Sequence, residues 1–121
     1  WFTVNPNYKE VNVAEQEKDP DSILNFYKHL IQMRKEYPII VYGSYKLLYP
    51  DHKTAFVYER MLEDEKLLVA CNFSAEELEL EVPAEFVQKE AELLISNYHE
   101  AKISEKLVLR PYEARVYRIT K

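Results

Sequence analysis

The most constraining feature of this 121-residue sequence is residues 19–37, DPDSILNFYKHLIQMRKEY, the one long segment with a clear helical period. At about 100° per residue, its apolar side chains fall on two adjoining stripes. One stripe contains Ile23, Phe26, Leu30, Met33 and Tyr37, and the other contains Leu24, Tyr27 and Ile31. The stripes together cover about half of the helix surface, which indicates that two neighbouring structures pack against this helix.

Both ends of this helix are predicted from residue chemistry. Asp19 can accept hydrogen bonds from the free amides of the first turn, and Pro20 suits the first helical position. Asp21 complements the positive end of the helix dipole, and Pro38 ends the helix.

Arg34 lies between the two apolar stripes. A buried guanidinium is unfavourable unless carboxylates or carbonyls accept its hydrogen bonds. We therefore expect Arg34 to be a structural cross-tie between the helix and the element that covers it.

The sequence after Gly43 has the features of an antiparallel β domain, because turn signals recur about every eight to twelve residues. The run at 67–71 is apolar on both faces, as in a strand inside a covered sheet, whereas 77–82 alternates between glutamate and apolar residues. Strands are predicted at 45–49, 54–61, 66–73, 77–82, 91–96, 107–110 and 114–120. About seven short strands around one core predict a two-sheet Greek-key sandwich, preceded by the long helix.

The sharpest boundary falls where the helical period gives way to the strand period. We therefore predict two parts, residues 1–37 with a loop over 1–18 and the long helix, and residues 38–121 with the sandwich. The sequence opens with Trp1 and not with Met, so we expect it to be cut from a longer protein.

Charge and cysteine content argue against several classes of function. The formal charge is −5 and Lys and Arg are scattered, which does not favour binding to nucleic acid or to an anionic membrane. No apolar run approaches the roughly 20 residues of a membrane-spanning helix. Cys71 is the single cysteine and lies in an apolar run, so we expect a buried thiol, no disulfide and a reducing, cytoplasmic location.

The polar residues do not form a recognisable catalytic or metal site. Glu76, Glu77, Glu79 and Glu81 are expected on one solvated strand face, where they cannot oppose each other across a substrate. The histidines lack the spacing of metal ligands, and one glycine cannot form a phosphate-binding loop. We therefore predict no catalytic, substrate-binding or metal-binding residue in this chain and no cofactor. The three histidines are His29, His52 and His99.

Tyrosine is abundant, with ten residues, and leaves one alternative open. Exposed tyrosines can stack on sugars in a carbohydrate-binding module, although tyrosine also fills the cores of β-sandwiches. The tyrosines considered for a sugar platform are Tyr42, Tyr45, Tyr49, Tyr58, Tyr112 and Tyr117.

Several segments together resemble a known enzyme family. The opening WFTVNPNYKEVNV, the helix DPDSILNFYKHLIQMRKEYP and the following IIVYGSYKLL are similar to the C-terminal part of bacterial oligo-1,6-glucosidases and related alpha-glucosidases. The later segments KLLVACNFS, AELLISNY and LRPYEARVYRI resemble the terminal strands of these enzymes. They belong to the alpha-amylase family of glycoside hydrolases.

The resemblance implies that residues 20–37 are the last helix of a (β/α)₈ barrel that is otherwise absent, and that the sandwich is the terminal domain. The family's retaining hydrolysis uses an aspartate nucleophile, a glutamate acid/base and a second aspartate, all on earlier barrel strands. The resemblance therefore implies an alpha-glucosidase acting on alpha-1,6 or related linkages of short gluco-oligosaccharides, and an inactive structural role for this part of it. A trehalose-6-phosphate hydrolase or a dextran glucosidase is the alternative, because substrate choice lies in barrel loops.

Overall fold

The computed structural model describes residues 2–89, 91–99 and 102–120, which fall into two compact units, Trp1–Pro38 and Ile39–Lys121. The first unit is helical, and the second contains the seven β-strands of the described residues. The prediction of a mostly β, antiparallel sandwich after one long helix is confirmed.

The first unit contains a 3₁₀ helix at Pro6–Lys9 and two α-helices, α1 at Val13–Gln16 and α2 at Ile23–Glu36. The expectation of a plain loop over 1–18 is therefore wrong. Both short helices begin at an asparagine whose side chain accepts from a backbone amide, Asn5 from Asn7 and Asn12 from Glu15. Such local caps need no extended hydrophobic period, which is why the period alone did not reveal these helices.

The long helix α2 begins later than predicted. Ser22 is its N-cap, and the Ser22 hydroxyl accepts from the Asn25 amide at 3.2 Å. Asp19 instead closes the preceding turn, where its carboxylate accepts from the Asp21 amide and its carbonyl accepts from the Asn25 side chain. Both Asp and Ser suit an N-cap, so their residue types did not decide between these two starts. The helix ends at Glu36, before Pro38, as expected.

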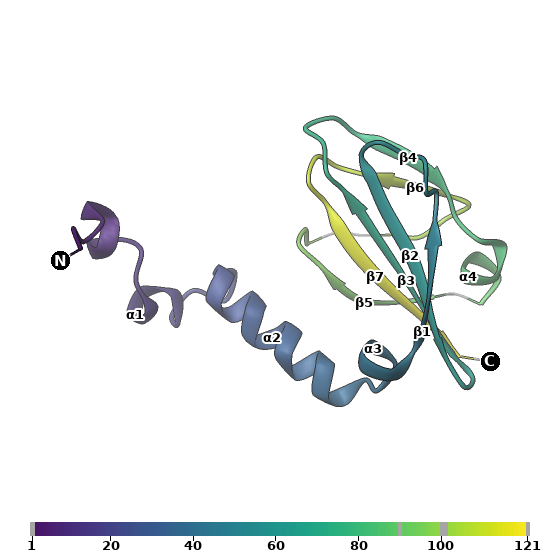
Figure 1. Ribbon diagram of the computed structural model, residues 1–121, viewed down its shortest axis with the longest axis horizontal. Coiled ribbons are helices and arrows are strands. Elements are labelled where there is room, and N and C mark those ends of the chain that lie inside the picture. Colours follow the sequence, from purple (N-terminus) through teal and green to yellow (C-terminus); the bar gives the residue numbers. More distant parts are fainter. Residues whose placement is uncertain (1, 90, 100–101, 121) are drawn as a thin grey trace. The chain divides into compact units, whose positions relative to one another are not determined.

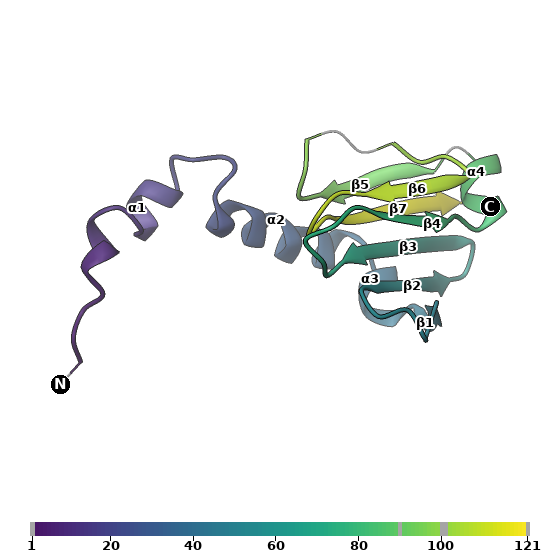
Figure 2. The same cartoon turned by 90° about the horizontal axis from the view of Figure 1, so that it is seen from above.

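The second unit is built from two antiparallel sheets. The larger sheet has the strand order β1-β2-β3-β7-β5, and the smaller sheet pairs β4 with β6. Figures 1 and 2 show β4 and β6 as a separate layer beside the larger sheet. The strands are β1 Ser44–Leu48, β2 Ala55–Leu62, β3 Glu65–Asn72, β4 Leu78–Glu81, β5 Glu92–Ser96, β6 Lys106–Leu109 and β7 Ala114–Thr120.

The core lies between the two sheets. Alternating residues of β2, β3 and β7 face β4 and β6, and Tyr117 contributes a fully buried ring. On β4, Leu80 is buried and Glu79 is exposed, which confirms the predicted alternation. The buried cluster contains Val57, Leu68, Ala70, Leu80, Phe86, Leu107, Leu109, Tyr117 and Ile119.

Two short helices in this unit were not predicted. The apolar run Ile39–Tyr42 forms α3, and Ile39 is fully buried there. Ala84–Gln88 forms α4 between β4 and β5, with Phe86 buried in the core. Each helix is a single turn, too short to display a helical period in the sequence.

Candidate functional site

The glutamates considered for acid/base chemistry are exposed to solvent. Glu76, Glu77, Glu79 and Glu81 are exposed, and Glu79 forms an ion pair with Lys106 at 2.5 Å. The ion pair joins β4 to its partner strand β6. These carboxylates therefore form the solvated face that the sequence predicted.

The histidines are also exposed, and one of them has a structural role. His52 Nδ1 accepts from the amides of Thr54 and Ala55 at 3.3 and 3.0 Å and so caps the turn before β2. Among the described residues, no three His, Cys, Asp or Glu side chains are grouped as a metal site requires. Burial raises the pKa of the half-buried Cys71 thiol, which keeps this thiol protonated near neutral pH.

The tyrosines proposed for sugar stacking do not share one surface. Tyr117 is buried in the core, and the Tyr49 hydroxyl donates to the Glu81 carbonyl at 2.5 Å. Tyr112 is exposed in a turn, where its φ of 54° places it in the left-handed region. Only Tyr45 and Tyr58 lie next to each other, with their ring centroids 5.2 Å apart.

A buried charged site is centred on Glu113, which is fully buried in the turn before β7. Its carboxylate accepts from Arg115 Nε at 2.7 Å and from Arg115 Nη2 at 2.9 Å. It also accepts from the Arg110 amide at 2.7 Å and from the Arg110 guanidinium at 2.9 and 3.1 Å. Two guanidinium groups thus clamp one carboxylate.

The surroundings of the Glu113 carboxylate anchor it further. Arg115 also donates to the carbonyls of Lys102 and Val108, and Arg110 lies 4.0 Å from the centroid of the Tyr98 ring. Burial raises the pKa of Glu113, but hydrogen bonds from Arg110 and Arg115 outweigh burial and lower this pKa to about 2. A carboxylate that stays ionised and fully hydrogen-bonded cannot donate a proton at neutral pH, so Glu113 has a structural and not an acid/base role.

Sequence reasoning did not identify this clamp. The sequence LRPYEARVYR contains one acidic residue between two arginines, but the same pattern is common on exposed turns. Only the burial of Glu113 distinguishes the two cases, and burial depends on the strands that cover this turn.

A row of four aromatic rings is the most prominent feature on the other face of the larger sheet. This aromatic row consists of Tyr45, Tyr58, Phe56 and Phe73, with successive ring centroids 5.2, 5.4 and 6.5 Å apart. Phe56 and Tyr58 alternate along β2 with Val57, which points into the core. The aromatic row therefore lies on the face opposite the core.

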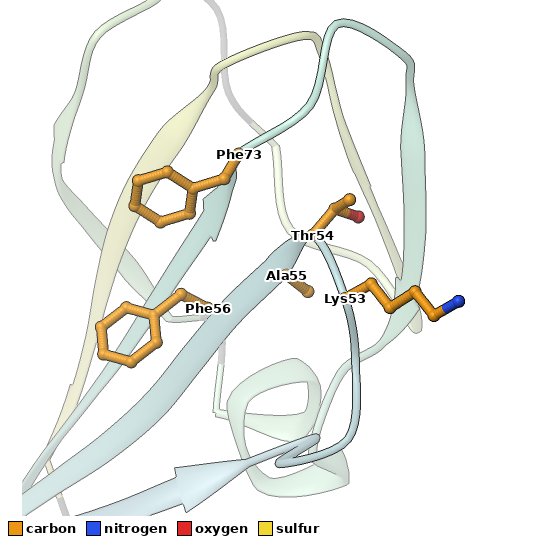
Figure 3. Close-up of a pocket in the computed structure, with 5 residues that line it drawn as sticks. All are labelled: Lys53, Thr54, Ala55, Phe56 and Phe73. Atoms are coloured by element: carbon orange, nitrogen blue, oxygen red, sulfur yellow. The ribbon is translucent and has the colours of Figure 1, made fainter.

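A shallow depression at one end of the aromatic row is lined by Lys53, Thr54, Ala55, Phe56 and Phe73. In Figure 3 the two phenyl rings project to the same side, whereas Lys53 and Thr54 extend away from the rings. The polar groups therefore do not converge on a ligand that stacks on these rings, as they do in most small-molecule sites. The depression is best described as apolar contact surface.

The helical unit contains two exposed ion pairs, Lys18 with Glu15 at 2.8 Å and Lys28 with Glu17 at 3.2 Å. Ser22, Gln16 and Asn25 form a polar network in which the Ser22 hydroxyl and the Asn25 side-chain amide donate to the Gln16 backbone carbonyl at 2.6 and 3.0 Å. On α2, Ile23, Tyr27 and Ile31 are exposed and Met33 is buried. Arg34 is exposed, and its role as a cross-tie stays a prediction, as does the choice of the stripe that meets the sandwich.

No helix within the described ranges is both long and apolar enough to cross a membrane.

Two protein families match successive parts of the chain. Residues 1–43 match the family described as "Alpha amylase, catalytic domain". Residues 45–116 match "Maltogenic Amylase, C-terminal domain". The second match covers more than half of the chain and contains most of the sandwich unit.

Curated relatives include several oligo-1,6-glucosidases. The chain is 52% identical over 77 residues to "Oligo-1,6-glucosidase" of Bacillus cereus, a match that covers 64% of this chain and 14% of the relative. It is 48% identical over 77 residues to "Probable oligo-1,6-glucosidase 2" of Bacillus subtilis, with the same coverage. The matched region thus spans only about one seventh of the length of these relatives.

Solved structures of similar chains include enzymes with different substrates. Trehalose-6-phosphate hydrolase of Bacillus licheniformis is 40% identical with a TM-score of 0.89, over 100% of this chain and 22% of that one. Isomaltulose synthase from Klebsiella sp. LX3 is 36% identical with a TM-score of 0.86, over 98% of this chain and 21% of that one.

Proposed function

Since the chain belongs to the alpha-amylase family of glycoside hydrolases, we propose that it is the C-terminal part of a retaining alpha-glucosidase. Its residues 45–116 belong to the maltogenic amylase C-terminal domain family. The proposed enzyme hydrolyses alpha-1,6 or related alpha linkages at the non-reducing end of short gluco-oligosaccharides. One observation carries this proposal. The catalytic-domain match ends at residue 43 and the C-terminal-domain match begins at residue 45, in a chain about 50% identical to oligo-1,6-glucosidases.

In this proposal the chain has a structural role in the enzyme. Its sandwich unit covers the last barrel helix and buries apolar surface, at about 25 cal/mol per Å² removed from water. The catalytic barrel is the partner of the sandwich unit, and a small oligosaccharide is the substrate of the whole enzyme. The saturated hydrogen bonding of Glu113 and the exposure of Glu76, Glu77, Glu79 and Glu81 are consistent with a chain that supplies no catalytic group.

The substrate of the proposed enzyme can be tested on the longer protein that contains these residues. We expect hydrolysis of isomaltose, with release of glucose in the alpha configuration detected by NMR immediately after cleavage. Release of beta-glucose would contradict retention. If the protein cleaves trehalose 6-phosphate and not isomaltose, it is a trehalose-6-phosphate hydrolase. If it prefers the ends of dextran chains, it is a dextran glucosidase.

A carbohydrate-binding module is the competing function, and the exposed rings of Tyr45, Phe56 and Phe73 are the observation that favours it. Aromatic side chains on a rigid sheet can stack on sugar rings. Titration of the chain with isomaltose or maltose, followed by tyrosine fluorescence, separates the two functions. A saturable change would support the binding module, and the absence of a change up to millimolar sugar would remove it.

We propose a cytoplasmic location for the enzyme. The chain has a single cysteine, Cys71, which is free, and a chain without an internal disulfide suits a reducing compartment. Fractionation of the source cells, with glucosidase activity measured in the cytosolic and secreted fractions, tests this location. Activity confined to the secreted fraction would contradict it.

A further inference from the structure

Asn72 begins the one segment of this sequence that has the acceptor pattern for asparagine-linked glycans. Residues 72–74 read Asn-Phe-Ser, which fits Asn-x-Ser/Thr with a residue other than proline in the middle. A glycan is bulky and hydrated, so an acceptor of this kind is ordinarily found in a surface loop. Asn72 is instead the last residue of β3, and its exposed fraction is 3%.

The side-chain nitrogen of Asn72 is fully used inside the fold. Nδ2 donates to the backbone carbonyls of Glu76 at 2.7 Å and Arg110 at 3.0 Å. The Leu109 carbonyl is a third acceptor, at 3.4 Å. The two N–H groups of this amide therefore face three backbone carbonyls, and these carbonyls occupy the space beside Nδ2.

The side-chain oxygen of Asn72 fixes the turn that follows β3. It accepts from the Ser74 amide at 3.0 Å and from the Ser74 hydroxyl at 2.8 Å. The Ser74 hydroxyl, which completes the acceptor pattern, also donates to the Glu76 carbonyl at 3.0 Å. The Asn72 amide thus joins the end of β3 in the larger sheet to the turn at 74–76 and to the end of β6 in the smaller sheet.

Transfer of a glycan to Asn72 would change this junction chemically. Nδ2 attacks C1 of the first sugar of a lipid-linked oligosaccharide diphosphate, and a bond forms between Nδ2 and C1. The bond from C1 to the phosphate oxygen breaks, the lipid diphosphate leaves, and the amide loses one proton. The product keeps one N–H where the fold uses two, and it carries a sugar ring where the carbonyls lie. A carbonyl that loses its only donor inside a fold is strongly unfavourable.

We propose that Asn72 accepts an asparagine-linked glycan only in the unfolded chain, and that this glycan and the native sandwich exclude each other. Folding removes Nδ2 from solvent, and a sugar on Nδ2 would separate β3 from the turn at 74–76 and from β6. The chain therefore reaches its native fold only if this corner closes before a lipid-linked glycan donor is met, or where no such donor exists. The inference concerns the fold of the chain and does not depend on the proposed glucosidase activity.

Translation into microsomes derived from the endoplasmic reticulum tests the inference, with the longer protein directed there by a secretion signal. Lys102→Asn supplies a matched control, because it creates the pattern Asn-Ile-Ser at 102–104 in the same unit, where positions 102 and 104 are exposed. Mass spectrometry measures the glycan at positions 72 and 102, before and after digestion of unfolded molecules by proteinase K. We expect glycan at both positions before digestion. In the resistant fraction, glycan should fall about tenfold at position 72 and stay unchanged at position 102.

The folded protein provides the second measurement. The longer protein, made without the secretion signal, is incubated with the glycan transferase and the lipid-linked donor, alongside a synthetic peptide of residues 66–78. We expect modification of the peptide and none of the folded protein at Asn72.

Four results would overturn the inference. Glycan at position 72 that persists in the resistant fraction would show that the fold tolerates it, and modification of the folded protein would show that Nδ2 is accessible. A peptide that stays unmodified while position 102 is glycosylated would show that Asn72 is no acceptor. Equal depletion at positions 72 and 102 would show that any glycan disrupts the sandwich, which refutes the specific role of Asn72.

Discussion

At the scale of single residues, Glu113 shows how a buried charge is retained in this fold. Hydrogen bonds from Arg110 and Arg115 satisfy its carboxylate, and they bind the turn before β7 to the side chain of Arg115 on that strand. Removing one partner of such a group leaves the opposite charges buried without compensation, which is more unfavourable than the loss of an exposed ion pair.

We expect Glu113→Gln to destabilise the fold in a manner that depends on pH. Because the pKa of Glu113 falls from 4.5 to about 2 on folding, its carboxylate stabilises the folded state above pH 4.5, and this contribution disappears as the pH falls towards 2. The free energy of unfolding should drop by about 3 kcal/mol at pH 7, and the difference from wild type should shrink between pH 4.5 and 2. Urea unfolding followed by circular dichroism measures both effects.

Glu77→Gln is the matched control for this experiment, since Glu77 is exposed before β4. We expect little change in stability at any pH, because water already solvates this carboxylate. Equal effects of Glu77→Gln and Glu113→Gln at pH 7 would contradict the role given to the clamp.

Gly43, the single glycine of the sequence, is required by a close approach of the backbone. A Cβ atom at this position would lie 2.5 Å from the Ile39 carbonyl oxygen and 3.3 Å from the Arg60 Cβ. Neither neighbour moves easily, since the Ile39 oxygen belongs to the backbone and also accepts from Arg60. We expect Gly43→Ala to lower the free energy of unfolding by about 1–3 kcal/mol, measured by urea unfolding. Ser44→Ala at the neighbouring exposed residue should stay within about 0.5 kcal/mol of wild type, and an equal loss would refute the steric explanation.

At the scale of elements, α4 is a five-residue helix that is held by its core contact. Phe86 is fully buried in the cluster between the sheets, and Lys66 on β3 binds Glu85 at 2.7 Å. No side chain caps the helix at Pro83. Since so short a helix has little stability of its own, the burial of Phe86 is what fixes it.

Phe86→Ala should therefore destabilise the sandwich by about 3–5 kcal/mol, because it removes a large ring from a fully buried position. The measurement is the free energy of unfolding in urea. Gln88→Ala on the exposed side of the same helix is the control and should be nearly neutral. A small effect of Phe86→Ala would mean that the core closes without α4.

At the scale of the whole molecule, we expect the catalytic carboxylates of the proposed enzyme to lie outside this chain. The carboxylates on β4 point to water and Glu113 is saturated with hydrogen bonds. We expect the 121-residue chain by itself to leave a nitrophenyl alpha-glucoside intact, whereas the longer protein cleaves it. The release of nitrophenol is the measurement, and turnover by the chain alone above an enzyme-free control would contradict this expectation.

The sequence by itself determined the class of the fold and the positions of its main elements. Strand alternation in 77–82, the apolar run at 67–71 and the helical period before Pro38 are local patterns, and they reflect the side-chain direction that each backbone geometry imposes. The strands at β1–β7 and the helix α2 therefore lie within a few residues of their predicted bounds.

Only the tertiary structure decided the helix cap, the short helix at residues 39–42 and the burial of Glu113. Whether residues 39–42 are helical and whether Glu113 is buried depend on contacts between segments distant in the sequence. The choice of Ser22 over Asp19 as the cap of α2 depends on the network that Ser22 forms with Gln16 and Asn25. The aromatic row is a further case, because its rings come from β1, β2 and the end of β3 and meet only through the strand register. Register and burial arise from pairing across the sheet, and a local pattern contains no information on which distant residue will lie opposite.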